Sequence, residues 1–178
     1  QRDNTLTVDL LRIDCETEEG PGYRYALLYS SVGFSGNEVA KPWMKRILGP
    51  KLGYYLAMII ETVVFHPPDI TIRWEEEEYN GECWIIMIGN VERTAGGSMC
   101  IAPGARIDDG EFRVSIIPSQ SRIKSMTKMM PKVASGTHVN EPGVLYFPAK
   151  ELEVNSIPPT TVDVDGDLFG KTPATITI

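Results

Sequence analysis

Alternating apolar and polar positions over much of the chain predict a protein built mainly from β-strands, because successive side chains of a strand point to opposite faces. A Gly-Pro-Gly sequence within residues 18–22 separates the first two such segments and predicts a hairpin. The predicted strands cover residues 6–13, 23–32, 70–74, 83–88, 112–117, 144–147, 151–154, 160–164 and 174–178.

Apolar residues at helical spacing predict two or three helices between the strands. The clearest stripe covers residues 52–64 and stops before two consecutive prolines, which cannot continue a helix. It fits a core helix, a helix that contacts lipid, or both. A shorter helix is expected over residues 37–48, and another helix over residues 119–133. Strands still dominate, so the predicted fold class is mostly β (α+β), a β-sandwich-like packing in a single domain of residues 1–178.

The charge and the cysteines exclude several functional classes. The 178 residues contain 24 Asp and Glu against 17 Lys and Arg, a net charge of −7. This argues against nucleic-acid binding, because phosphates attract a cationic surface. No apolar run reaches the roughly 20 residues of a membrane-spanning helix. Three scattered cysteines without a CxxC pair do not support a structural zinc site, and without a secretory signal at the start the expected location is the cytoplasm.

Two charged clusters each have two interpretations. Four consecutive glutamates, residues 75–78, form either a cation site or the solvated tip of a hairpin. Adjacent residues of an extended segment point to alternate faces, which favours the hairpin tip. Lys124, Lys128 and Lys132 follow one face of the helix expected there, and they form either a solvated surface or a contact with an anionic membrane.

Familiar catalytic and phosphate-binding motifs do not occur in the sequence. His66 precedes two prolines and His138 lies in what reads as a polar loop, and neither has a recognisable nucleophile nearby, so a hydrolytic triad is not expected. Neither a GxxxxGK(S/T) nor a GxGxxG sequence is present. The function must therefore be sought in other segments.

Three glycine-rich polar segments stand out instead, at residues 89–97, 105–112 and 162–173. Glycines in the first allow the backbone to approach a ligand or another segment closely. Two adjacent aspartates before a glycine in the second can chelate a hard cation or form an ordinary turn. The third reads as a hairpin tip with exposed carboxylates.

In their order and spacing, these segments resemble the C-terminal domain of bacterial diacylglycerol-kinase-like lipid kinases, a group similar to sphingosine kinases and more distantly to NAD kinases. The resemblance rests on Gly-Asn followed by Ala-Gly-Gly, on Ile-Ala-Pro-Gly-Ala-Arg-Ile-Asp-Asp-Gly-Glu-Phe, and on Val-Asp-Gly-Asp followed by Thr-Pro-Ala. Residues 31–34, 53–56 and 138–144 fit the same pattern, so the resemblance extends over nearly the whole chain.

The resemblance implies half of a two-domain enzyme that transfers the γ-phosphoryl group of ATP to the hydroxyl of a lipid such as diacylglycerol or a sphingoid base. The family's nucleotide loop, Gly-Gly-Asp-Gly-Thr, does not occur here. The N-terminal nucleotide-binding domain is therefore expected to be absent from this chain, which should be inactive alone. The expected partners are a lipid substrate, that N-terminal domain, a membrane surface and a second copy in a homodimer, but no nucleic acid.

The resemblance also implies roles for individual residues. Asp167 matches the family's catalytic base, which is a glutamate there and therefore one methylene longer. Asp165 and Gly166 would hold the turn that carries it. The predicted cleft-lining residues are Gly33, Asn90, Gly96, Gly97, Asp165 and Gly166.

A magnesium site is implied at the second segment. Asp109 would bind Mg²⁺ through its side chain, while Arg106 and Glu111 would contribute backbone carbonyls and Asp108 would lie outside the coordination shell. Few protein ligands are needed, because Mg²⁺ usually keeps several waters. This cation would be distinct from the Mg²⁺ that accompanies ATP.

A second interpretation comes from another functional class. Residues 164–174 also resemble the short PEGA-type repeat of surface-associated proteins. That resemblance implies a non-enzymatic, β-rich binding module. It leaves the first two glycine-rich segments without a role.

Overall fold

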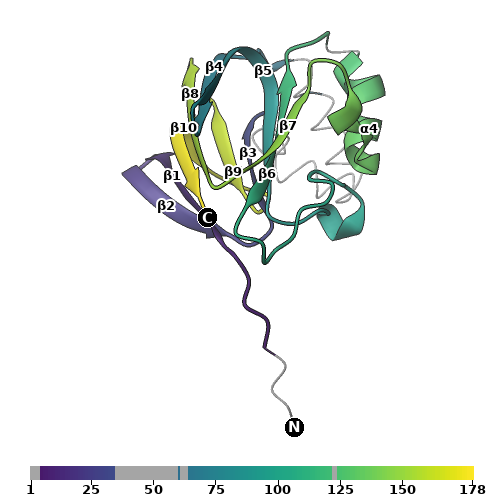
Figure 1. Ribbon diagram of the computed structural model, residues 1–178. Helices are drawn as coiled ribbons and strands as arrows, with labels where there is room; N and C mark the ends of the chain where they lie inside the picture. Colours follow the sequence, from purple (N-terminus) through teal and green to yellow (C-terminus); the bar gives the residue numbers. More distant parts are fainter. Residues whose placement is uncertain (1–4, 35–59, 61–63, 122–123) are drawn as a thin grey trace, which may run out of the picture.

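The computed structural model describes residues 5–34, 60, 64–121 and 124–178, and within them ten strands form one hydrogen-bonded sheet folded into two layers (Figure 1). The strand order is β2-β1-β10-β8-β4-β5-β3-β9, with β9 also paired to β10 and with β6 between β5 and β7. The strands are β1 (Leu11–Thr17), β2 (Gly20–Ala26), β3 (Tyr29–Gly33), β4 (Asp69–Trp74), β5 (Glu77–Gly89), β6 (Phe112–Pro118), β7 (Leu145–Ala149), β8 (Glu151–Ile157), β9 (Thr161–Val164) and β10 (Asp167–Thr177).

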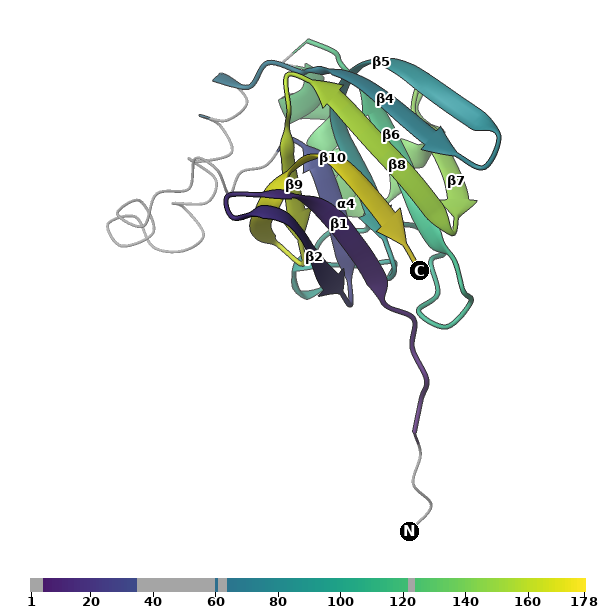
Figure 2. The same cartoon turned by 90° about the vertical axis from the view of Figure 1, so that its left-hand side faces the viewer.

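Two long strands connect the layers. The first half of β5 pairs with β4, and its second half pairs with β3 and β6. The first half of β10 pairs with β9, and its second half pairs with β8 and β1 (Figure 2). Gly170 permits the crossing in β10, because a Cβ there would lie 2.4 Å from the Glu16 carbonyl oxygen. The predicted mostly-β, sandwich-like fold is confirmed.

Apolar side chains fill the space between the layers. Alternate residues of the strands contribute fully buried side chains, as strand geometry requires. The largest of these are Phe112, Leu11, Ile13, Ile70, Ile72, Ile86, Ile88, Ile116, Ile117, Leu152 and Ile176. All three cysteines are buried and unpaired, and burial raises the pKa of Cys83 to about 12 and that of Cys15 to about 11. These two thiols are therefore protonated at neutral pH and are poor nucleophiles.

The helical segments cover one outer face of the sandwich (Figure 1). A π-helical turn, η2 (Ser125–Met129), leads into α4 (Met130–Ser135), and a 3₁₀ turn, η3 (Thr137–Asn140), follows. Met129 and Val133 pack into a second apolar cluster against Trp84 and Ile117. The predicted helix over residues 119–133 is thus shorter than expected. Pro131 is tolerated because it lies in the first turn of α4.

The segment predicted as one strand, residues 23–32, is two strands. The chain bends at Leu27 and Leu28, where their amides donate to the Asp165 carboxylate instead of a neighbouring strand. The first hairpin also turns at residues 18–19 rather than at Gly-Pro-Gly, which lies within β2. Both errors arise because contacts distant in sequence decide where a strand stops.

The first predicted strand, residues 6–13, overlaps β1 only at residues 11–13, and residues 6–10 form no strand. The other predicted strands are present with changed bounds. β5 starts at Glu77, so only residues 75–76 form the hairpin turn, and Arg73 pairs with Glu78 at 2.6 Å. β10 starts seven residues before its predicted beginning.

The predicted helices over residues 37–48 and 52–64 lie outside the described residues, apart from Ile60 and Val64. Among the residues that the structure describes, no helix is long and apolar enough to span a bilayer.

His138 is fully buried, which corrects the expectation of a polar loop. Its Nε2 atom lies 3.1 Å from the Ser115 hydroxyl of β6, and Ser115 is also fully buried. The interaction holds η3 against the sheet. Burial lowers the pKa of His138, because desolvation disfavours the charged imidazolium.

The free energy of unfolding is expected to fall as the pH drops below about 6.5, the pKa of an unfolded histidine. In that range the unfolded chain binds a proton that folded His138 does not, so up to about 1.4 kcal/mol is lost per pH unit. Urea unfolding of wild type at pH 7 and pH 5.5 measures the slope. His138→Gln should flatten it; an equal slope in the variant and in wild type would contradict this role.

Candidate functional site

The β9–β10 turn is fixed to the bend between β2 and β3. Asp165 and Gly166 have positive φ angles of 50° and 91°. The Asp165 carboxylate accepts hydrogen bonds from the amides of Leu27 at 2.8 Å, Leu28 at 2.9 Å and Tyr29 at 3.0 Å. The Asp165 amide in turn donates to the Tyr29 carbonyl at 3.0 Å. Bonds from several amides to one carboxylate hold the turn in a single position.

Asp167 is the first residue of β10 and follows this fixed turn directly. Its backbone pairs with Val164, and its side chain is exposed. Within the part of the chain that the structure describes, its carboxylate has no hydrogen-bond or ion-pair partner. A carboxylate on a rigid turn and open to solvent can accept a proton from an approaching hydroxyl.

Asn90 follows β5 and is fully buried. Its side-chain amide donates to the carbonyls of Leu27 and Asp9, both at 2.9 Å, and its backbone amide donates to Leu28. Asn90 therefore connects the β2–β3 bend with the N-terminal segment. Its side chain supports the site from within the protein.

Asp9 is a residue that the sequence did not single out. Its amide donates to the Ile107 carbonyl at 2.7 Å, and its carboxylate accepts from the Gly110 amide at 2.8 Å. Asp9 thus extends the contacts of Asn90 to the Asp-Asp-Gly loop, residues 105–111. No local motif could have indicated it, because its partners lie about 80 and 100 residues away.

These contacts form one hydrogen-bond chain, which we define as Asp165, the bend at residues 27–29, Asn90, Asp9 and Gly110. It joins the acidic β9–β10 turn to the Asp-Asp-Gly loop. Both lie at the end of the sandwich from which the N-terminal segment leaves (Figure 1). The structure therefore brings together two segments that the sequence separates by more than 50 residues.

The Asp-Asp-Gly loop presents several carboxylates beside one arginine. The two Asp109 carboxylate oxygens accept from the Glu111 amide and from Arg113, each at 3.3 Å. Arg113 also binds Glu111 at 3.0 Å, and exposed Arg106 pairs with Asp108 at 3.4 Å. Among the described residues no three His, Cys, Asp or Glu side chains converge as a metal cluster. Carboxylate and carbonyl oxygens are the ligand types that Mg²⁺ takes, and the assignment of Asp109, Arg106 and Glu111 as its ligands stays a prediction.

The glycine loop lies beside the Asp-Asp-Gly loop. Gly96 and Gly97 belong to η1 (Ala95–Gly97), are exposed and have positive φ, and no atom of the described residues lies within 4 Å of where a Cβ would be. The Glu92 carboxylate links the glycine loop to the chain just before the Asp-Asp-Gly loop, because it accepts a hydrogen bond from the Gly104 amide at 3.1 Å. The described residues thus leave the backbone of the two glycines open to a partner of this protein.

Gly33 is separate from the other predicted residues. Gly33 ends β3, whereas Tyr29, which contacts the acidic turn, begins it. Gly33 therefore lies about 13 Å along the strand from Tyr29. A Cβ at Gly33 would come within 2.9 Å of the Trp84 carbonyl oxygen, and φ is 104°. Glycine is therefore needed for the backbone path, and the cleft-lining role of Gly33 stays a prediction.

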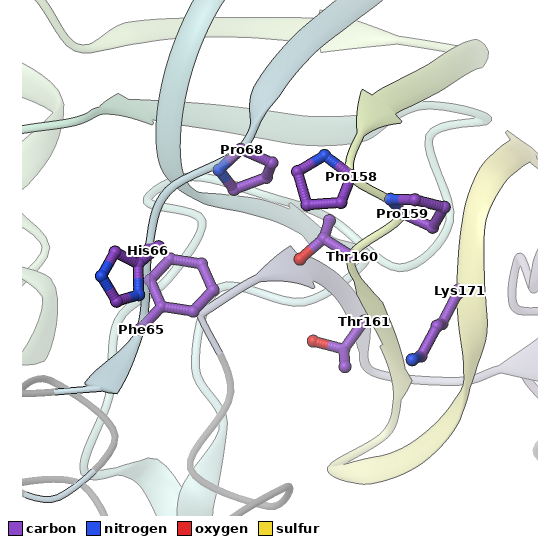
Figure 3. Close-up of a pocket in the computed structure, with 8 residues that line it drawn as sticks. All are labelled: Phe65, His66, Pro68, Pro158, Pro159, Thr160, Thr161 and Lys171. Atoms are coloured by element: carbon purple, nitrogen blue, oxygen red, sulfur yellow. The ribbon is translucent and has the colours of Figure 1, made fainter.

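A pocket of about 160 Å³ lies near Gly33, at the far end of the β9–β10 hairpin from Asp167. Thr160, Thr161 and Lys171 face Phe65 and His66 across it (Figure 3). Thr161 donates its hydroxyl to the Gly33 carbonyl at 2.7 Å. The volume is well below the roughly 300–1,000 Å³ of usual ligand pockets. It does not by itself define a site for an acyl chain.

The closed sandwich, with its acidic turn and glycine loops at one end, defines a domain of the NAD kinase-like β-sandwich class. The chain belongs to the family described as the YegS C-terminal NAD kinase beta sandwich-like domain, whose profile matches residues 30–178. The match includes all three glycine-rich segments, two of which a PEGA-type repeat leaves unexplained. The resemblance inferred from the sequence is confirmed.

Diacylglycerol kinases are among the curated relatives. The chain is 28% identical over 131 residues to the diacylglycerol kinase of Staphylococcus haemolyticus, covering 74% of this chain and 39% of the relative. It is 30% identical over 130 residues to that of Staphylococcus saprophyticus, covering 73% of this chain and 42% of the relative. The chain thus spans about two fifths of the length of these relatives.

Solved structures share the fold. A diacylglycerol kinase from Bacillus anthracis superposes with a TM-score of 0.61 at 17% identity, covering 97% of this chain and 50% of that chain. A candidate diacylglycerol kinase from the same organism gives a TM-score of 0.67 at 22% identity, covering 97% and 53%. At these identities the likeness establishes the fold alone.

Proposed function

We propose that this chain is the substrate-side domain of an ATP-dependent lipid kinase that phosphorylates a lipid hydroxyl of the diacylglycerol or sphingoid type. The observation that carries the proposal is the exposed Asp167 carboxylate on a turn fixed by Asp165, in a domain whose relatives include diacylglycerol kinases. The nucleotide would be held mainly by a domain outside this chain, and the chain alone would then be inactive.

Asp167 would act as the general base. It would take the proton of the lipid hydroxyl while the oxygen attacks the γ-phosphorus, and the bond from phosphorus to the leaving diphosphate oxygen would break. Proton transfer needs heavy atoms about 2.6–3.2 Å apart. Because aspartate is shorter than the family's glutamate, the lipid hydroxyl must approach the turn more closely here. A fixed turn helps, since its backbone pays no further ordering cost during the reaction.

The hydrogen-bond chain would position this base relative to the Asp-Asp-Gly loop. Asp165 and Asn90 both form hydrogen bonds with the backbone of the bend, so each would affect the position of the base without contacting the substrate. Asp109, with the carbonyls of Arg106 and Glu111, would hold a Mg²⁺ ion and so stiffen the loop. When bound, the ion would supply positive charge near a phosphorylated substrate.

The proposal is tested with the complete enzyme, in which this chain is joined to or co-expressed with its nucleotide-binding partner domain. We expect ATP-dependent phosphorylation of diacylglycerol or a sphingoid base in mixed micelles, followed with radiolabelled ATP. This chain alone is the matched control and should give no product. A complete enzyme that binds ATP yet phosphorylates no lipid alcohol would contradict the proposal.

A further inference from the structure

The helical face of the sandwich has a charge opposite to that of the chain as a whole. Residues 119–140 contain four of the 17 Lys and Arg residues and none of the 24 Asp and Glu residues. The net charge of the chain is −7, so the remainder is strongly acidic. Such separation of charge gives the molecule one basic side that an anionic surface would select.

Three lysines define this side, which we call the lysine face: Lys124, Lys128 and Lys132. They are spaced four residues apart and therefore follow one side of the helical segment. On the opposite side, Met129 and Val133 are buried against the sandwich, so the lysine face is turned outward. Lys124 and Lys128 are exposed and form no ion pair with any residue that the structure describes, whereas Lys132 pairs with Glu141.

The lysine face lies beside the candidate site. The carbonyl of Ala134 in α4 accepts from the Cys100 amide at 3.3 Å, which joins the helical segment to the loop that follows η1. Figure 1 shows α4 next to η1 on the same side of the sandwich. A surface that binds the lysine face would therefore also come near the glycine loop.

We propose that the lysine face docks this protein onto an anionic lipid bilayer. The inference rests on the proposed function, because the substrate of a lipid kinase lies in a membrane. Each lysine near an anionic leaflet strengthens binding about fivefold, and the attraction falls off within a Debye length of about 10 Å at 0.1 M salt. Among the described residues, none of the exposed large hydrophobic side chains lies between residues 124 and 140, so binding depends on charge and is reversible.

Co-sedimentation of this chain with vesicles tests the inference without nucleotide or turnover. We expect binding to vesicles of equal phosphatidylglycerol and phosphatidylcholine at low salt, little binding to phosphatidylcholine alone, and release at 0.5 M salt. Lys124→Glu/Lys128→Glu should weaken binding at least about thirtyfold, since each lost lysine counts for about fivefold. The neutral variant Lys124→Gln/Lys128→Gln should lie between it and wild type.

The matched controls are Lys128→Glu and Lys150→Glu, which change the net charge equally. Lys150 is exposed between β7 and β8, and its carbonyl accepts from the amide of the C-terminal Ile178. The C-terminus lies on the other side of the sandwich from α4 (Figure 1). Lys128→Glu should bind at least about fivefold more weakly, and Lys150→Glu should bind within about twofold of wild type. Equal loss in both variants, equal binding to neutral vesicles, or binding only to an acidic protein would overturn the inference. Vesicle binding by a chain whose complete enzyme phosphorylates no lipid would refute the kinase proposal alone.

Discussion

Replacing Asp167 with asparagine is expected to lower kcat of the complete enzyme about 10²–10⁴-fold, the usual contribution of a positioned general base. Asparagine keeps the size of the side chain but cannot take the hydroxyl proton. Because the Asp167 side chain is exposed and its carboxylate has no hydrogen-bond or ion-pair partner among the described residues, the free energy of unfolding should change by less than about 0.5 kcal/mol. Steady-state lipid phosphorylation and urea unfolding measure the two effects.

The control variants separate base chemistry from loss of charge. Asp167→Glu restores the family's longer carboxylate and should retain most of the activity. Glu151→Gln removes an exposed carboxylate from β8, far along the sheet, and should leave kcat unchanged. If Asp167→Asn turned over at the wild-type rate, or if Glu151→Gln lost as much activity, Asp167 would not be the base.

Asn90→Asp is expected to have the largest effect on stability, a loss of about 4 kcal/mol at pH 7. The exchange is nearly isosteric, but an ionised carboxylate would place an acceptor oxygen against the carbonyls of Leu27 and Asp9, in a position with no access to solvent. Breaking two buried hydrogen bonds and burying a charge each cost about 1–3 kcal/mol or more. Urea unfolding measures the difference.

The pH dependence gives this prediction a distinctive sign. Burial raises the pKa of the new carboxyl in the folded variant above the value of about 3.9 that it has in the unfolded chain. At a pH between the unfolded and the folded pKa, the folded variant therefore binds more protons than the unfolded chain. Its stability relative to wild type should therefore improve as the pH falls towards 4. Asn155→Asp, at an exposed position of β8, is the matched control and should stay within about 0.5 kcal/mol of wild type.

Local pattern predicted most of the strands because each buries alternate side chains. β4 and β6 begin and end within one residue of the sequence-based bounds. The bend at Leu27 and Leu28 could not be predicted, because it exists through the Asp165 carboxylate 137 residues away. The burial of His138 was missed for the same reason: its polar neighbours suggested a loop, but Ser115 of β6 receives it inside the fold.

The candidate site was predicted only in part. The resemblance to the kinase family indicated Asp165, Asp167, Asn90 and Asp109 as separate positions. These residues lie in three segments, which the structure joins through Asp9, a residue that no sequence pattern indicated. Gly33 illustrates the opposite case. Its place in the resemblance is explained by a positive φ and the nearby Trp84 carbonyl, which are backbone requirements rather than evidence of ligand contact.

Amide hydrogen exchange in the Asn90→Asp protein tests most directly whether one hydrogen-bond chain holds both acidic segments. Asn90 is the middle of that chain, so its loss should speed exchange of the Leu28 amide beside Asp165 and of the Gly110 amide on Asp9 by similar factors, up to the roughly 10³-fold that a loss of about 4 kcal/mol gives the core amide of Ile72 through global unfolding. Faster exchange at Leu28 with no change at Gly110 would show that the acidic turn and the Asp-Asp-Gly loop are held independently.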